Sequence, residues 1–174
     1  RFGPNGIDEG GLEDDEVRTT AIGLARYAFE YLEAAMVIDK TIGEKASFKF
    51  VAPIPAYFLA LHSIELSLKA YLRHRGVTVR ELRSKKFGHD IRACYRKAKE
   101  LGLRNDFKMR ADDMRAMLML IDLNADQSLR YIRTGFRRFP SWAIVEPFAV
   151  RLHQVVAPLV GYPKTFAISY PHIG

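Results

Sequence analysis

The chain has 174 residues, a length that suits a single domain with a buried core. Its one cysteine, Cys94, excludes an internal disulfide and a cysteine metal cluster, and it favours a reducing, cytoplasmic location. Charged residues interrupt the apolar stretches before the roughly 18 residues that a membrane span needs, so we expect neither a membrane span nor a signal peptide.

Charge is distributed unevenly along the chain. Residues 1–16 carry six acidic side chains and one arginine, a net charge of −5. Because the whole chain carries +7, residues 17–174 carry +12. A body this basic favours polyanionic partners such as nucleic acid, and a solvated basic face without a partner explains the same charge equally well.

The first half of the chain predicts a flexible segment followed by two helices. Residues 1–16 are rich in glycine and acidic residues and predict a flexible lead-in. From 17 to 42 apolar residues recur at steps of three and four, which predicts a helix that ends at Gly43. Pro53 and Pro55 suit a first helical turn, so a second helix is expected from about 55 to 75, before Gly76.

The second half predicts a basic connector over 77–87, with one short helical turn, and then a third helix over about 89–101. Gly102 is the expected left-handed cap of that third helix. Asp106 is a candidate cap for a fourth helix that continues to Arg133, and Ser141 is the candidate cap of a fifth over 142–160. Residues 161–174 predict an extended tail that lies on the body or on a partner.

These elements indicate an all-α protein, a single helical domain of about five helices over residues 17–160. The second helix is apolar nearly all round its circumference and should therefore lie at the centre of the bundle. Four polar side chains nevertheless share a stripe of about 80° on it: His62, Glu65, Lys69 and Arg73. Charges on a buried helix must be paired. The stripe is either an internal Glu65–Lys69 pair beside a satisfied histidine, or a pocket in which His62 and Lys69 contact an anion.

A His-Asp pair opens the third helix. Asp90 suits the first turn, where a carboxylate accepts hydrogen bonds from free N–H groups and meets the helix dipole. His89 is explained less well as a cap, and a helix N-terminus is a place where phosphate binds. Basic residues surround the pair, which predicts a phosphate-facing patch: Arg80, Arg83, Lys85, Lys86, Arg92, Arg96 and Lys97.

The segments HSIELSLKAYLRHRG and GHDIRACYRKAKELGL resemble the HEPN-type helical domains of prokaryotes, in which a helix bearing Glu and Lys precedes a His-Asp-hydrophobic step. The segment LNADQSLRYIRTG is similar to the Arg-Tyr element that follows the next long helix in many such domains. This resemblance covers residues 56–135. It implies an up-and-down helical bundle, often a homodimer, that binds or acts on RNA or nucleotides, frequently within a toxin–antitoxin or phage-defence system with a cognate protein partner. The candidate ligand-binding residues are His62, Glu65, Lys69, Asp90, Tyr131 and Arg133.

Some members of that family are metal-independent ribonucleases with an arginine and a histidine four to six residues apart near the last core helix. This chain departs from the pattern, because no histidine follows Arg130 until His153. If the chain is a nuclease, His89 is the expected general acid or base, since histidine titrates near neutral pH. Arg83 or Arg130 would then stabilise the charge on the transferring phosphate.

Neither the five histidines nor the aspartate pairs of the fourth helix predict a metal site or another cofactor. Arginines and aromatics over 130–142 suit stacking on single-stranded RNA, but core aromatics beside a basic helix end explain them better. Three hypotheses follow, in order of preference. The chain is a HEPN-like module that binds RNA or nucleotide without cleaving it, a ribonuclease using His89, or a structural dimerisation bundle without a ligand.

Overall fold

The computed structural model describes residues 9–45, 51–125 and 138–171. Within them lie α-helices and one π-helix, η1, and no strand, so the all-α class is confirmed. There are more helices than the five expected, because short ones join the longer ones. The bounds are α1 Glu9–Arg18, α2 Ala21–Ile38, η1 Asp39–Gly43, α3 Ile54–His74, α4 Val79–Arg83, α5 Ile91–Glu100, α6 Leu103–Asp106, α7 Ala111–Ala125 and α8 Trp142–Val160.

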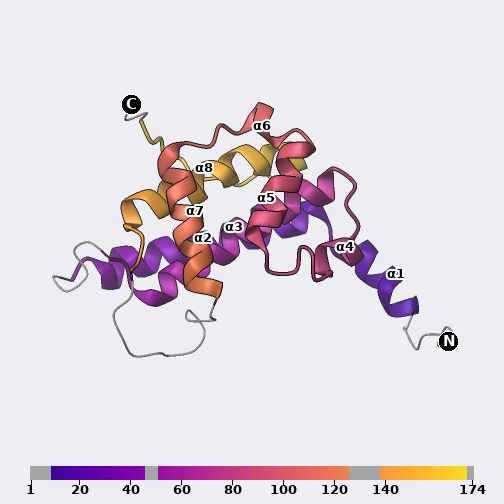
Figure 1. Ribbon diagram of the computed structural model, residues 1–174, viewed down its shortest axis with the longest axis horizontal. Coiled ribbons are helices and arrows are strands. Elements are labelled where there is room, and N and C mark those ends of the chain that lie inside the picture. Colours follow the sequence, from indigo (N-terminus) through magenta and orange to yellow (C-terminus); the bar gives the residue numbers. More distant parts are fainter. Residues whose placement is uncertain (1–8, 46–50, 126–137, 172–174) are drawn as a thin grey trace.

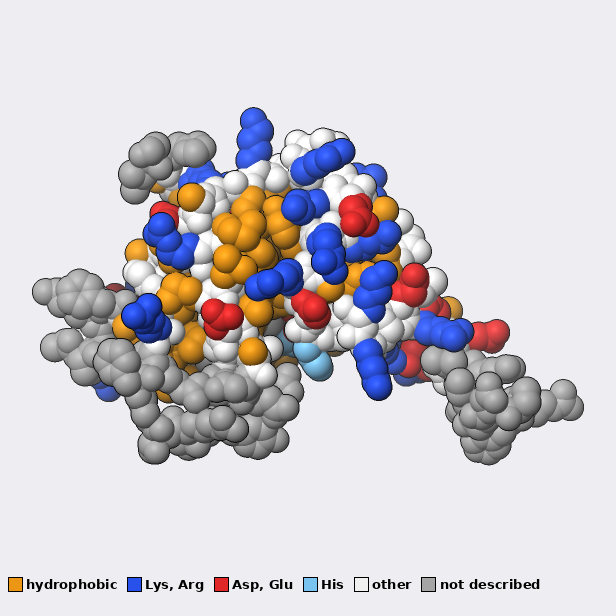
Figure 2. All heavy atoms as spheres, viewed as in Figure 1, with side chains coloured by type: hydrophobic (Ala, Val, Ile, Leu, Met, Phe, Trp, Pro, Cys, Tyr) orange, Lys and Arg blue, Asp and Glu red, His pale blue; other side chains and the backbone are white. Residues whose placement is uncertain are grey.

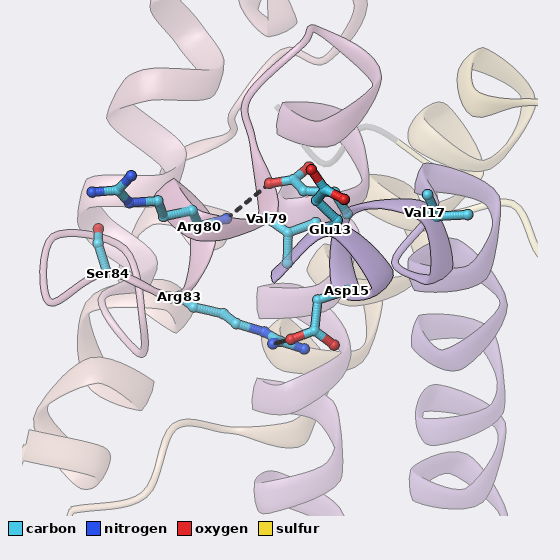
Figure 3. Close-up of a pocket in the computed structure, with 8 residues that line it drawn as sticks. Glu13, Asp15, Val17, Val79, Arg80, Arg83 and Ser84 are labelled. Carbon is cyan, nitrogen blue, oxygen red and sulfur yellow. Dashed lines mark hydrogen bonds and ion pairs between the residues drawn. The ribbon is translucent and has the colours of Figure 1, made fainter. Parts of the chain in front are cut away.

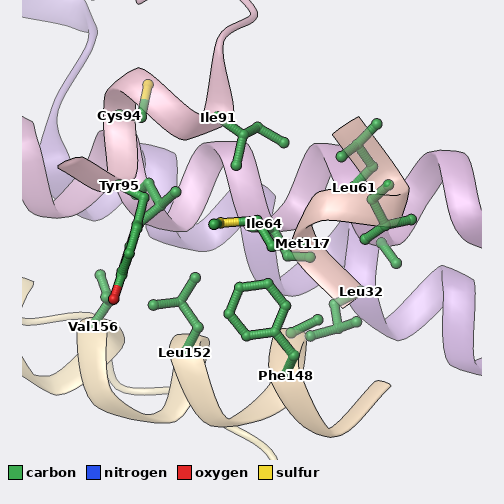
Figure 4. Packing of buried hydrophobic residues seen from close by; sticks show 14 of the residues in the cluster. Leu32, Leu61, Ile64, Ile91, Cys94, Tyr95, Met117, Phe148, Leu152 and Val156 are labelled. Carbon is green, nitrogen blue, oxygen red and sulfur yellow. The ribbon is translucent and has the colours of Figure 1, made fainter. Parts of the chain in front are cut away.

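Helix α3 is the centre of the molecule, as its apolar circumference predicts. It packs against α2, α8 and α5, and α7 packs against α8 (Figure 1). Side chains from these helices meet in one continuous core, in which Leu32, Ile64, Phe148 and Leu152 are almost completely buried (Figure 4). Buried apolar area of this kind is the main stabilising contribution to a fold of this size.

The chain leading into α8 is tied to α3 through a buried tyrosine. The Tyr57 hydroxyl donates a hydrogen bond to the Pro140 carbonyl at 2.6 Å and accepts one from the Ala52 amide at 3.2 Å. Burial raises the pKa of Tyr57 to about 12, although the hydrogen bond from Ala52 opposes the shift. The phenol therefore stays protonated and the link persists at all ordinary pH values.

The predicted ends of several helices are confirmed to within two residues. Helix α3 spans Ile54–His74, α8 spans Trp142–Val160, and α4 is the short turn expected in the connector. Gly76, Gly102 and Gly161 follow α3, α5 and α8 with φ of 89°, 108° and 84°, a left-handed conformation that favours glycine. Ser141 precedes α8 as predicted, but its side chain makes no capping hydrogen bond.

The prediction that Asp106 caps the fourth helix is wrong. Asp106 ends the short helix α6 instead of opening α7, which begins at Ala111. The side chain that closes the first turn of α7 is Asp113, which accepts a hydrogen bond from the Arg110 amide at 2.7 Å. Asp113 is buried and also pairs with Arg151 of α8 at 2.6 Å, so a tertiary contact fixes this helix start. The expected continuation from Ala125 to Arg133 lies outside the described residues.

The described part of the acidic lead-in, from residue 9 on, differs from the flexible segment expected over 1–16. Residues Glu9–Arg18 form α1, and Thr20 starts a separate helix by accepting a hydrogen bond from the Gly23 amide at 3.0 Å. Arginines from distant parts of the chain hold the end of α1, since Arg73 pairs with Glu16 at 3.1 Å and Arg83 pairs with Asp15. Charge complementarity with the basic body therefore orders a segment that has no apolar periodicity of its own.

The C-terminal tail, as far as residue 171, lies on the body of its own chain. Residues 163–171 have no helix or strand, and Gln154 of α8 donates hydrogen bonds to the Phe166 and Ile168 carbonyls, each at 2.7 Å. The Phe166 ring stacks on Phe29 of α2 with a centroid distance of 4.7 Å. The tail thus covers the seam between α2 and α8.

Helix α8 is the one described helix that is long and apolar enough to cross a membrane. Half of its most apolar stretch is buried inside the structure, against α2, α3 and α7. Burial of this extent is typical of the core helix of a folded domain.

Candidate functional site

Glu65 is the centre of a polar cluster built from two separate parts of the chain. Its side chain, on α3, is 8 % exposed. Oε1 lies 2.6 Å from Lys69 Nζ and 3.5 Å from His89 Nδ1, and Oε2 lies 3.9 Å from His62 Nδ1. We name His62, Glu65, Lys69 and His89 the Glu65 cluster. Three members follow from the helical spacing of α3, whereas His89 arrives from the loop before α5.

The charges of the cluster keep the carboxylate ionised. Burial by itself raises the pKa of Glu65, but its interactions with His62 and Lys69 outweigh burial and lower the pKa from 4.5 to about 2. A buried carboxylate at neutral pH is therefore compensated by neighbouring cations, as low local dielectric requires.

Lys69 joins the cluster to the loop before α5. Its ammonium donates to Glu65 and also to the Gly88 carbonyl, both at 2.6 Å. Asp90, two residues further, is the N-cap of α5 and accepts a hydrogen bond from the Ala93 amide at 2.9 Å. Lys69 and Asp90 together fix the loop that presents His89, so both have a structural role at this site.

A cavity of about 700 Å³ opens beside the cluster. We name it the His89 pocket. Three of its residues, Leu61, Ile91 and Ile121, are apolar. The remaining residues that line it are mostly polar or charged: Arg83, Ser84, Lys85, Gly88, His89, Asp90, Arg92, Asn124 and Ala125. The volume lies within the range of pockets that take small ligands, and the side chain of His89 is 67 % exposed.

Basic residues are common on this side of the molecule. Figure 2 shows lysine and arginine side chains around an apolar area in the middle of one face. At the His89 pocket Lys85 and Arg92 are exposed, so their charges are available to an anion in solution.

Arg83, the third cation of the pocket, is already paired. Its guanidinium forms an ion pair with Asp15 of α1 (Figure 3). Arg83 also lines a second cavity, of about 800 Å³, between α1 and α4. A single arginine therefore borders both cavities and is held by an acidic residue of α1.

The structure brings together five of the candidate residues predicted from sequence. His62, Glu65, Lys69 and His89 form the Glu65 cluster, and Asp90 lies next to His89. The three remaining candidates besides Arg83 lie outside the described residues: Arg130, Tyr131 and Arg133.

Two contributions to the candidate site were not predicted from the sequence. Asn124 lines the His89 pocket from the end of α7, and no local motif marks it. Asp15 and Glu16 of α1 pair with arginines of the body, and the contrast between a −5 segment and a +12 body was the available signal.

Other reactive groups among the described residues do not form a second site. Cys94 is buried, its thiol lies 3.5 Å from the Phe87 carbonyl, and burial raises its pKa to about 12. The thiolate needed for nucleophilic attack is therefore absent at neutral pH. No group of three or more His, Cys, Asp or Glu side chains within the described part of the chain has a geometry that could hold a metal ion.

Comparison with protein-family models, with curated proteins and with solved structures gives no match to this chain.

Proposed function

We propose that this chain is a HEPN-like module that binds RNA or a nucleotide through phosphate at the His89 pocket. One observation carries the proposal. The exposed imidazole of His89 borders a cavity of ligand size together with Arg83, Lys85 and Arg92. Guanidinium and ammonium groups beside an imidazole around one cavity favour an anionic ligand.

The polar stripe of α3, formed by His62, Glu65, Lys69 and Arg73, is largely paired within the protein, and this pairing indicates which residues would contact the ligand. Lys69 donates to two protein oxygens and Arg73 donates to carbonyls of residues 16, 19 and 77, so both serve the fold. Glu65 is neutralised by Lys69, which limits its repulsion of a phosphate. His89 and the exposed cations beside it are the side chains left to contact the ligand.

The proposal includes the wider properties that the HEPN resemblance implies. They are an up-and-down bundle of about five helices, a homodimer, a cytoplasmic location and a role with a cognate partner in a toxin–antitoxin or phage-defence system. The basic body, at +12 over residues 17–174, supports a polyanionic ligand in particular.

A filter-binding titration with total RNA tests the proposal. We expect the parent protein to bind with an affinity that falls steeply as salt rises, because phosphate contacts release counterions. His89→Ala should weaken binding by about fivefold or more at fixed salt, since it removes a contact worth roughly 1 kcal/mol. His74→Ala removes another exposed histidine, at the end of α3, and should leave affinity nearly unchanged. RNA affinity equal in both variants, or absent in all, contradicts the proposal.

A second candidate function, a metal-independent ribonuclease, is favoured by the contact between His89 and Glu65. A carboxylate 3.5 Å from Nδ1 orients the imidazole, the arrangement that acid–base histidines commonly use. Incubation of the parent with RNA in the presence of a chelator, analysed on a gel, tests this function. Cleavage by the parent that His89→Ala abolishes establishes the enzyme. Binding without cleavage supports the recognition module. If the protein neither binds nor cleaves RNA, a structural dimerisation bundle is the remaining hypothesis.

A further inference from the structure

Helix α1 is attached to the body mainly through charges. Glu16 accepts one hydrogen bond from the Arg80 amide at 3.2 Å and pairs with Arg73 at 3.1 Å, while Asp15 pairs with Arg83. Arg73 also donates to the Glu16 carbonyl at 2.8 Å. Two of these contacts are ion pairs between a carboxylate of α1 and an arginine of α3 or α4, and the other two each use one backbone group.

Among the side chains that the structure describes, apolar packing contributes little to the same junction. Val17 of α1 is 76 % exposed, and Figure 1 shows α1 extending away from the bundle beyond α4. The cavity of about 800 Å³ between α1 and α4 leaves the two helices incompletely packed (Figure 3). Exposed ion pairs stabilise weakly and are screened by salt, so α1 is held by contacts that a competing anion can replace.

Arg83 connects this junction to the His89 pocket, since it lines both cavities. While Asp15 holds its guanidinium, the positive charge of Arg83 is neutralised at the border of the pocket. A phosphate and a carboxylate bind a guanidinium through the same paired hydrogen bonds, so the two compete for it directly.

We propose that α1 is an autoinhibitory acidic helix, which competes in cis with polyanionic ligands for Arg83. The inference rests on the proposed function, because it names the regulation of the same pocket. Because α1 is part of the same chain, its carboxylates have a high effective concentration beside Arg83. A phosphate in solution must compete with the Asp15 carboxylate before it can bind Arg83. Binding of a polyanion then displaces α1, and displacement of α1 by any other means strengthens binding.

The test compares two double variants that raise the net charge equally. Asp15→Asn with Glu16→Gln removes the carboxylates that hold α1. Glu30→Gln with Asp112→Asn is the matched control, because each of these exposed carboxylates pairs with an arginine at 2.9 Å elsewhere on the surface. A fluorescein-labelled 20-nucleotide poly(U) RNA is the probe, and its affinity is measured by anisotropy at several salt concentrations.

We expect the α1 variant to bind the RNA about tenfold more tightly than the parent, with a steeper salt dependence, because it frees Arg83 for phosphate. The control should change affinity by much less. Hydrogen exchange gives the direct readout, since the amides of residues 9–18 in the parent should exchange faster once RNA is bound.

Each outcome separates the inference from the proposed function. RNA binding that is equal in the parent and the α1 variant, or an equal gain in the control, overturns autoinhibition and leaves the proposed function standing. RNA binding without faster exchange in α1 overturns it as well. Absence of RNA binding in every variant, the α1 variant included, overturns the proposed function and the inference with it.

Discussion

Replacement of Glu65 by glutamine should be among the most destabilising conservative changes in this chain. The carboxylate is 8 % exposed and pairs with Lys69 at 2.6 Å. Lowering its pKa from 4.5 to about 2 corresponds to about 3 kcal/mol of stabilisation of the ionised form, at about 1.4 kcal/mol for each pH unit. Glu65→Gln also leaves the half-buried ammonium of Lys69 without its counter-charge, so we expect the free energy of unfolding to fall by about 3 kcal/mol at pH 7.

The same residue predicts a specific pH dependence. The folded-state pKa of Glu65 lies below the unfolded value, so its contribution is complete above pH 4.5 and is lost as the pH falls from 4.5 towards 2. The difference in stability between the parent and Glu65→Gln should therefore shrink to roughly half by pH 3.

Urea denaturation followed by circular dichroism, at pH 7 and at pH 3, measures both quantities. Glu30→Gln is the control, because its carboxylate belongs to an exposed i,i+4 pair with Arg26 and should matter little. If Glu65→Gln loses no more stability than the control, the carboxylate is not the buried, compensated charge that the geometry indicates. A difference that is the same at both pH values also refutes the reasoning, since it would be independent of ionisation.

Three further predictions follow from buried or strained positions. Cys94, whose pKa burial raises to about 12, should resist alkylation by iodoacetamide at pH 8 in the native protein and react on unfolding; fast native labelling contradicts this. Burial lowers the pKa of His153 although its bond to the Ala25 carbonyl opposes the shift, so stability should fall as the pH drops below 6.5. In thermal denaturation, the His153→Gln variant should not show this loss of stability below pH 6.5. A variant whose stability depends on pH as the parent's does would contradict the prediction. Gly76→Ala should lower the free energy of unfolding, measured with urea, by about 1 kcal/mol, and Gly76→Asn should lower it less. The cause is the backbone φ of 89°, since an added Cβ would meet no atom within 4 Å. Equal stability of the parent and the alanine variant would contradict this prediction.

The Glu65 cluster shows where local sequence reasoning succeeds and where it stops. The i,i+3 and i,i+4 spacing of His62, Glu65 and Lys69 places them on one stripe of α3 whatever the rest of the chain does. Nothing in that spacing predicts that His89 would meet the same carboxylate. Residues 65 and 89 belong to different helical units, and the loop between them is fixed by the bond from Lys69 to the Gly88 carbonyl.

The sequence by itself determined the all-α class, the central position of α3, and the helix ends that glycine marks after α3, α5 and α8. These features depend on periodicity, φ preference and proline geometry, which act over a few residues. Only the tertiary structure decided that Asp113 closes the start of α7, because that role comes with the pairing to Arg151. It also decided that the acidic segment is a helix docked on Arg73 and Arg83, since charges far apart in sequence attract only once the fold has brought them together.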